Sequence, residues 1–172
     1  MIKVKRLIAL LVVLLTTVGC DQATKSLAQN HLSDLEPLSF LNGIVSLQYA
    51  ENPGAFLSLG ARLSEETQYW IFTVAVAAVL SALFIFALRE SSKTHLTVSI
   101  AFALFLGGGI GNLIDRLTND GRVIDFMHIG IGSLRTGIFN VADMALMAGV
   151  FLLGLHSYRT RNTLPTDSES TS

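Results

Sequence analysis

Four long uncharged runs divide the chain into apolar and polar segments. The runs cover residues 7–20, 70–88, 96–114 and 144–155. Runs 70–88 and 96–114 hold 19 residues each, which is close to the length that crosses a bilayer as a helix. Tyr69 and Trp70 lie at one end of the second run, where interfacial aromatic side chains are common. We therefore predict transmembrane helices at about 68–88, 95–114 and 137–157, and a fourth at about 5–27 if the first run is retained.

Two polar loops, at about 28–67 and 115–136, separate these helices. In the first loop, residues 44–49 alternate between apolar and polar after the pair Asn42-Gly43, which predicts a hairpin or small sheet. A turn is expected at 52–54, and a helix is expected to start at Ser64, with acids in its first turn. The second loop contains the apolar run 123–127, which has one acid, Asp125, inside it.

The first apolar run has two interpretations. Basic residues precede 14 uncharged residues, as in a cleaved secretory signal. Val18-Gly19-Cys20 even resembles the end of a lipobox, although Thr17 stands where a leucine is usual. Alternatively, the run is a retained first transmembrane helix. Fourteen residues span only about 21 Å, so such a helix would extend outside the run. The pattern alone leaves both open.

Composition agrees with a membrane protein and narrows its chemistry. Hydrophobic residues make up 51% of the chain and charged residues 15%, and the mean hydropathy is +0.54. Soluble domains carry about 25% charged residues. The net charge of −1 argues against a nucleic-acid partner. One cysteine excludes an internal disulfide and a Cys-rich metal site, and no two of the four histidines are spaced i,i+4. We expect no metal and no cofactor.

Basic residues order the spans across the membrane. They precede the first span, lie in the link between the second and third spans, and follow the fourth: Lys3, Lys5, Arg6, Arg89, Lys93, Arg159 and Arg161. With four helices, all three sets fall on one side, which predicts cytoplasmic termini and outward-facing loops. Cleavage of the first helix would leave three spans and an external N-terminus, which this pattern does not exclude.

That topology gathers polar residues at the outer interface. Asp21 ends the first helix, Asp143 opens the fourth, and Asp125 lies in the loop before it. The outer end of the third helix adds Asn112, Asp115 and Arg116. An acid inside a membrane segment is costly, so it suggests a functional site. The alternative is that each acid is structural, capping backbone amides or pairing with a neighbour, as Asp115 would with Arg116.

Carboxylates are the catalytic groups that this sequence offers. It has no Cys-His pair and no Gly-x-Ser-x-Gly motif. Two carboxyl groups held close share a proton, so one can activate water while the other donates to a carbonyl oxygen. Asp125 and Asp143, both in apolar surroundings, form the best pair. The competing hypotheses are a small transporter or proton channel that uses these acids as relays, and a structural lipoprotein lipidated at Cys20.

Five segments resemble one family in their order and spacing. They are Asp21-Gln22-Ala23-Thr24-Lys25, Glu51-Asn52-Pro53-Gly54-Ala55-Phe56, Gly108-Gly109-Ile110-Gly111-Asn112-Leu113-Ile114-Asp115-Arg116, Val123-Ile124-Asp125-Phe126 and Phe139-Asn140-Val141-Ala142-Asp143. The set is similar to the lipoprotein signal peptidases (signal peptidase II), the bacterial membrane aspartyl peptidases. The resemblance implies a mostly α fold with four transmembrane helices, a small periplasmic β-cradle formed by the first polar loop, and a short periplasmic helix.

The same resemblance implies an aspartyl endopeptidase that cleaves prolipoproteins before the diacylglyceryl-modified cysteine. It assigns Asp125 and Asp143 as catalytic. Substrate-binding or supporting positions would be Asp21, Lys25, Asn52, Gly54, Asn112, Asp115, Arg116, Phe139, Asn140 and Ala142. Residues 7–20 would then be a retained anchor and Cys20 would not be lipidated. We expect one peptidase domain at 1–160, a disordered cytoplasmic tail at 161–172, and a monomer in contact with lipids of the bacterial inner membrane.

Overall fold

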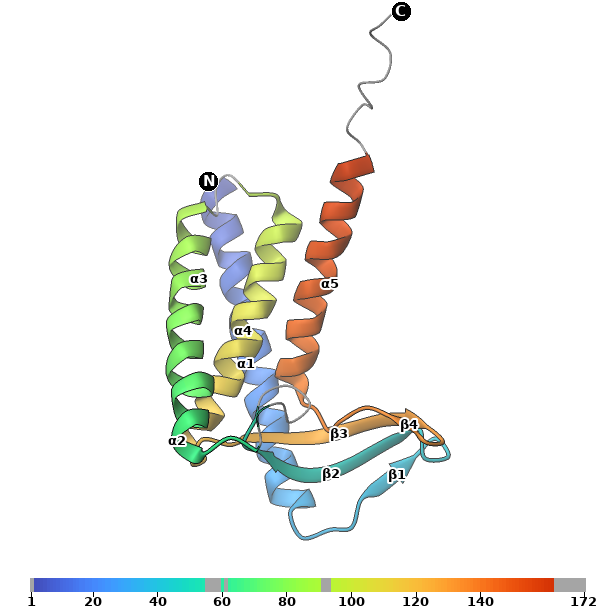
Figure 1. The fold of residues 1–172 in the computed structure, drawn as a ribbon. Coiled ribbons are helices and arrows are strands. Elements are labelled where there is room, and N and C mark those ends of the chain that lie inside the picture. The colour runs from blue at the N-terminus through green and yellow to red at the C-terminus, as the bar shows by residue number, and fades with distance from the viewer. Residues whose placement is uncertain (1, 55–59, 61, 91–93, 163–172) are drawn as a thin grey trace, which may run out of the picture.

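A computed structural model describes residues 2–54, 60, 62–90 and 94–162 of the chain. Four helical segments form an upright bundle, in which the start of the first helix and the end of the last lie at the same end (Figure 1). α1 is Ile2–Leu32, α4 is Leu96–Thr118 and α5 is Val141–Asn162. The second segment joins α2 (Glu65–Gln68), the π-helix η2 (Tyr69–Ala75) and α3 (Val76–Glu90). All four segments are long and apolar enough to cross a membrane.

Helix boundaries differ from the predicted ones mainly at the sheet end of the bundle. α1 runs to Leu32 rather than to about 27, and α4 runs to Thr118 rather than to 114. Left-handed Asp120 and Gly121 follow α4 and end it. α5 begins at Val141 rather than at 137, because Phe139 bonds to a strand instead. It continues to Asn162, two residues into the segment predicted as a tail, and residues 163–172 lie outside the described ranges.

The helix start predicted at Ser64 is confirmed. The Ser64 hydroxyl accepts a bond from the Thr67 amide at 3.3 Å, and two acids follow it in the first turn. This short helix continues directly into η2 and α3 rather than standing apart from the membrane span. The π-helical segment was not predicted. Ala55 and Phe56 of the second motif fall outside the described residues.

A four-stranded antiparallel sheet lies across the end of the bundle at which α1 ends and α5 begins (Figure 1). Its order is β1 (Leu38–Phe40), β2 (Val45–Asn52), β3 (Val123–Ile131) and β4 (Leu134–Arg135). The predicted hairpin is confirmed as β1 and β2, joined by a turn with left-handed Leu41, Asn42 and Gly43.

The predicted small sheet is confirmed, but the first loop supplies only two of its strands, because β3 and β4 come from the second loop. Residues 123–126 are buried on both faces of the sheet, so their sequence does not alternate. β3 also covers the edge of β2 that a lone hairpin would leave open.

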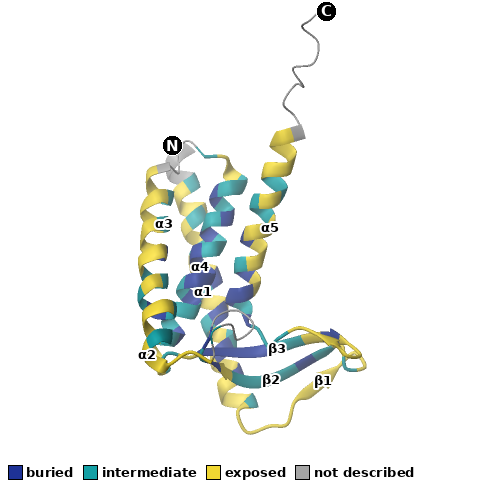
Figure 2. Cartoon of the chain, in the orientation of Figure 1, coloured by how far each residue is buried: buried dark blue, intermediate teal, exposed yellow. Residues whose placement is uncertain are grey.

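α4 is the central helix, and glycines let its neighbours approach it. It packs against α1, α3 and α5, and its buried face is visible in the middle of the bundle (Figure 2). A Cβ atom added at Gly107 would lie 2.8 Å from Cβ of Thr17 in α1. One added at Gly108 would collide with the Ala142 carbonyl of α5. Glycine at these two positions therefore lets α1 and α5 approach α4 closely.

Candidate functional site

A cluster of buried polar side chains lies where α1, α4 and α5 meet the sheet. Its members come from segments far apart in the chain and are each less than 9% exposed: Asp21, Lys25, Asn52, Asp115, Asp125, Asn140 and Asp143. Asn112 lies among them, half-buried. The polar residues predicted to gather at the outer interface therefore form one connected cluster.

Asp143 occupies the first turn of α5, where Asn140 caps the helix. The Asn140 side-chain oxygen accepts a bond from the Asp143 amide at 2.9 Å. In return, Asp143 Oδ2 accepts one from the Asn140 amide at 3.2 Å. This reciprocal pair is a capping box, and the positive end of the helix dipole also favours a carboxylate there. The second oxygen, Oδ1, accepts from Asn112 Nδ2 at 3.1 Å.

Asp125 lies in β3, and both of its carboxylate oxygens also accept hydrogen bonds. Asn140 Nδ2 donates to Oδ1 at 2.6 Å, and Asn52 Nδ2 donates to Oδ2 at 2.9 Å. Burial raises the pKa of Asp125 from 3.8 to about 6, and the nearby charge of Asp143 adds to the rise, while the two asparagine bonds oppose it. Its carboxyl group therefore exchanges protons close to neutral pH.

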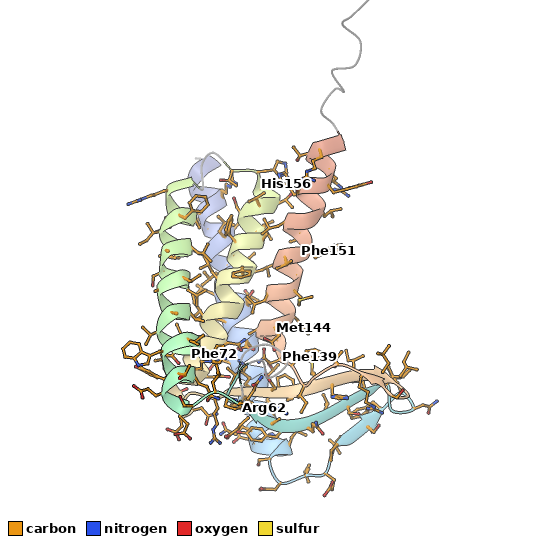
Figure 3. The ribbon with its side chains drawn as sticks, in the orientation of Figure 1. Arg62, Phe72, Phe139, Met144, Phe151 and His156 are labelled. Carbon is orange, nitrogen blue, oxygen red and sulfur yellow. The ribbon has the colours of Figure 1, made fainter. Side chains whose placement is uncertain are left out.

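Two asparagines connect the two aspartates. Asn140 Nδ2 contacts Asp125 and also donates to Asn112 Oδ1 at 3.1 Å, while the amide group of Asn112 donates to Asp143. Phe139 brings Asn140 to this place, because its backbone bonds to Met127 in both directions at 2.8 and 2.9 Å. Figure 3 shows Phe139 where the sheet meets the start of α5. Pairing of this short segment with β3 thus sets Asp143 next to Asp125.

Lys25 connects α1 to α4 within the cluster by contacting three polar side chains. Its ammonium group contacts Asp21 at 2.7 Å, Asp115 at 2.9 Å and the Asn112 side-chain oxygen at 2.9 Å. The bond to Asn112 directs the NH₂ group of that asparagine toward Asp143.

Asp21 and Asp115 hold the residues that precede the two aspartates of the site. Asp21 Oδ1 accepts a bond from the Ala142 amide at 2.8 Å. Asp115 Oδ2 accepts one from the Ile124 amide at 3.0 Å. Ala142 is fully buried, so it supports the site from the interior. One lysine and two carboxylates therefore fix both chain segments that carry Asp125 and Asp143.

Gln22 and Gly111 belong to this cluster, although we did not predict them as site residues. Gln22 Nε2 donates to Asp115 Oδ1 at 2.8 Å and to the Gly111 carbonyl at 3.1 Å. A Cβ atom at Gly111 would lie 2.5 Å from Asp21 Oδ2, so only glycine leaves room for that carboxylate. Gln22 directly follows Asp21, and Gly111 directly precedes Asn112, in two of the quoted segments. This adjacency is the sequence signal that could have identified them.

Arg116 fixes the turn after β2. It donates to the Gly54 carbonyl at 2.6 Å and to the Asn112 carbonyl at 3.3 Å, and its guanidinium lies 5.8 Å from the ring centre of Phe72. The Gly54 amide in turn bonds Asn52 Oδ1 at 2.9 Å, which forms the predicted turn. Arg116 Nε has no hydrogen-bond partner among the described residues. Beside Arg116, a cleft of about 470 Å³ opens between Pro53, Tyr69 and Leu117.

The chemistry available at this site is that of paired carboxyl groups. Over residues 2–54, 60, 62–90 and 94–162, no group of three or more His, Cys, Asp or Glu side chains is placed to hold a metal ion. Asp125 and Asp143 are both buried, and each accepts a hydrogen bond from Asn140, which links them. Such a pair can exchange a proton and activate a water molecule.

Comparisons with known proteins agree on one family. Residues 12–159 match the model of the family described as signal peptidase (SPase) II. A lipoprotein signal peptidase of Oleidesulfovibrio alaskensis is 36% identical over 142 residues, which cover 83% of this chain and 89% of that protein. One of Leifsonia xyli subsp. xyli is 38% identical over 154 residues, but the match spans 86% of this chain and only 66% of that relative.

A solved structure shares the fold. It is a bacterial membrane enzyme determined by the in meso method at 2.3 Å resolution. The TM-score is 0.77 with 24% sequence identity, and the match covers 94% of each chain.

Proposed function

The chain belongs to the signal peptidase II family, and on this basis we propose that it removes signal peptides from prolipoproteins with Asp125 and Asp143 as its catalytic pair. We further propose that it cleaves the peptide bond before a diacylglyceryl-modified cysteine. The observation that carries the catalytic assignment is the link through Asn140, which bonds Asp125 by its side chain and Asp143 by its backbone. The other acids of the cluster, Asp21 and Asp115, are both paired with Lys25.

The proposed reaction uses one ionised and one protonated carboxyl group. The ionised group takes a proton from water as the water oxygen attacks the scissile carbonyl carbon, and the protonated group donates to the carbonyl oxygen. In the tetrahedral intermediate the carbon–nitrogen bond then breaks as the carboxyl group that took the proton from water donates it to the leaving amine, while a hydroxyl group of the intermediate returns its proton to the other carboxylate. Asp125 suits this exchange because its pKa of about 6 lies near neutral pH. Asn52, Asn112 and Asn140 hold the carboxyl groups in position.

The position of the site suits a lipid-anchored substrate. The cluster lies at the end of the candidate spans where the sheet begins, so a substrate anchored in the bilayer can reach it from the side. We place that end at the outer face of the inner membrane and the chain termini in the cytoplasm, because Arg6, Arg89, Arg159 and Arg161 lie toward the other end.

A transport function finds less support. A proton or ion relay needs a path of polar groups through the bilayer. The buried charged side chains of the described ranges belong to the cluster at the sheet end of the bundle. Buried polar groups elsewhere along the spans are the hydroxyl side chains of Thr17, Thr73 and Ser99.

The test is cleavage of a defined precursor by the purified protein, followed by mass spectrometry. We expect a prolipoprotein carrying the diacylglyceryl group to be cut before its cysteine, with and without EDTA. The matched precursor without the lipid should remain intact. Cleavage at another bond, or equal cleavage of the unlipidated precursor, would contradict the proposed specificity, and loss of cleavage with EDTA would contradict a metal-free reaction.

A further inference from the structure

The second membrane span begins as a π-helix, Tyr69–Ala75, before it continues as α3. Short π-helical segments next to α-helices are frequent at functional sites. Thr73 is the buried residue of this segment, with 4% of its surface exposed. Its hydroxyl oxygen, Oγ1, has no hydrogen-bond partner among the described residues. An unpaired hydroxyl is costly in apolar surroundings, so we expect it to meet a polar group from outside the chain.

Hydroxyl groups in the α-helical parts of the spans bond to their own helix instead. Thr17 Oγ1 donates to the Val13 carbonyl at 2.8 Å. Ser81 Oγ donates to the Ala77 carbonyl at 2.7 Å. In a π-helix the backbone bonds close over five residues rather than four, which turns the fourth preceding carbonyl away from the side chain. The π-helix therefore leaves the Thr73 hydroxyl available for another partner.

Thr73 faces α4 at the level of Arg116. Deeper in the bundle, a Cβ atom added at Gly109 would lie 2.5 Å from Leu80, which fixes the alignment of the two spans. Seven residues make about two helical turns. Because the spans are antiparallel, seven residues before Leu80 and seven after Gly109 bring Thr73 opposite Arg116. The neighbouring Phe72, labelled in Figure 3, agrees with this level, since its ring centre lies 5.8 Å from the Arg116 guanidinium.

Arg116 brings a second unpaired polar group to the same place. Its terminal nitrogens donate to the Gly54 and Asn112 carbonyls, but its Nε is buried and has no partner within the described ranges. An arginine N–H group can only donate, and a threonine hydroxyl can donate as well. Two neighbouring donors fit one acceptor with two lone pairs, which is a carbonyl oxygen. The pair Thr73 and Arg116 therefore suits a ligand that carries a carbonyl group.

The depth of this pair favours the carbonyl of a lipid ester. Tyr69 and Trp70 are both more than half exposed and mark the interfacial end of the span, and Thr73 lies about one turn deeper. The glycerol esters of lipids lie at this boundary between headgroups and hydrocarbon. The cleft of about 470 Å³ beside Arg116 is also lined by Tyr69, so it opens next to the pair from the outer side.

We propose that Thr73 Oγ1 and Arg116 Nε bind an ester carbonyl of the diacylglyceryl group on the substrate. This assignment rests on the proposed function and adds the residue that recognises the lipid. The glyceryl group is attached to the cysteine directly after the scissile bond. Arg116 lies one turn of α4, about 6 Å, from Asn112, which donates to Asp143. An ester bound at Arg116 therefore leaves the scissile bond close to the aspartate pair.

The test compares two lipid-modified precursors that have the same peptide. In one precursor the fatty chains are joined to glycerol by esters, and in the other by ethers, which lack carbonyl oxygens. Cleavage is measured in dodecyl maltoside micelles, which contain no competing ester lipid. Thr73→Val removes the hydroxyl and keeps the shape of the side chain, and Thr73→Ser retains a hydroxyl. Thr17→Val is the matched control, because that buried hydroxyl bonds to its own helix.

We expect the wild type to have a lower KM for the diester precursor than for the diether. Thr73→Val should raise the KM for the diester about 3–10-fold, as expected for the loss of one hydrogen bond, and should change kcat and the KM for the diether little. Thr73→Ser and Thr17→Val should keep the KM values of the wild type. Thr73→Val should also have a melting temperature at least as high as the wild type, because it removes an unpaired buried hydroxyl.

An unchanged KM for the diester in Thr73→Val would overturn the proposal. An equal rise for diester and diether would also overturn it, because the bound oxygen would then belong to the peptide. A lower melting temperature of Thr73→Val would show that the hydroxyl already has a partner in the protein, against the proposal. If the wild type cleaves neither precursor, the proposed function itself fails, whereas any of the other three results with an active wild type refutes the ester site alone.

Discussion

Lys25 provides the sharpest test of how the cluster is held. Its side chain is 2% exposed and bonds two carboxylates and one asparagine at 2.7–2.9 Å. The substitution Lys25→Met keeps much of the side-chain length and removes the charge. It leaves Asp21 and Asp115 buried without their shared cation, and it releases Asn112 to rotate away from Asp143.

The expected magnitude follows from burial. Removing one partner of a buried ion pair costs about 3–5 kcal/mol, because the remaining charge stays desolvated without compensation. We therefore expect Lys25→Met to lower the free energy of unfolding by that amount. Arg122→Met is the matched control, since the ion pair of Arg122 with Glu51 is exposed. Loss of such a pair costs about 0–1 kcal/mol.

A second variant separates charge from shape. Combining Lys25→Met with Asp115→Asn restores the net charge of the three groups to that of the wild type, and asparagine still offers an oxygen to the Ile124 amide. We expect this double variant to recover at least part of the lost stability.

The assay for these variants is unfolding in detergent, followed by circular dichroism. If Lys25→Met unfolds like the wild type, or if the double variant is no more stable than the single one, charge compensation by Lys25 is not what holds the cluster together.

Three further predictions use single sites. The pKa of Asp125 is raised from 3.8 to about 6, so between these pH values the folded protein holds a proton that the unfolded chain has released. The stabilisation that comes from this proton is complete below pH 3.8 and is lost as the pH rises through about 6. Between pH 4 and 7 the wild type should lose up to about 3 kcal/mol relative to Asp125→Asn, measured by unfolding across that range, and parallel curves would contradict this. Gly111→Ala should cost about 1–3 kcal/mol, because its Cβ would meet Asp21 Oδ2, whereas Gly154→Ala, with open space around it, should change stability little. Asn52→Ala removes a donor to Asp125 and should cost about 1.5–3 kcal/mol, and a smaller loss in the same assay would show that this bond contributes little.

The sequence predicted the number of helices and the place where the polar residues meet. Nineteen-residue uncharged runs identify spans directly, and basic residues at alternate ends order them. From that topology, Asp21, Asn112 and Asp143 were expected at one depth, and the structure places them within one hydrogen-bonded cluster.

The strand that carries Asp125 was not predicted, for a physical reason. Residues 123–126 are covered on both sides, so they show no alternation, and an acid in their midst argues against a buried strand. Their partner, β2, lies more than 70 positions earlier in the chain, and local pattern contains no information on that pairing.

The start of α5 was recoverable in part. Asn140 and Asp143 have the spacing of a capping box, which places the first turn of the helix after Asn140 rather than at 137. The second function of Asn140, as the link to Asp125, depends on the pairing of Phe139 with β3 and could not be read from that spacing.

The central claim is that Asp125 and Asp143 act together on the scissile bond, and it is tested most directly by cleavage of the lipid-modified precursor with purified Asp125→Asn and Asp143→Asn proteins. Asp120→Asn, which changes an exposed acid on the same end of the molecule, serves as the control. We predict that both site variants fold and insert but produce no cleaved product, while the control cleaves like the wild type. Wild-type cleavage by either site variant would contradict the account.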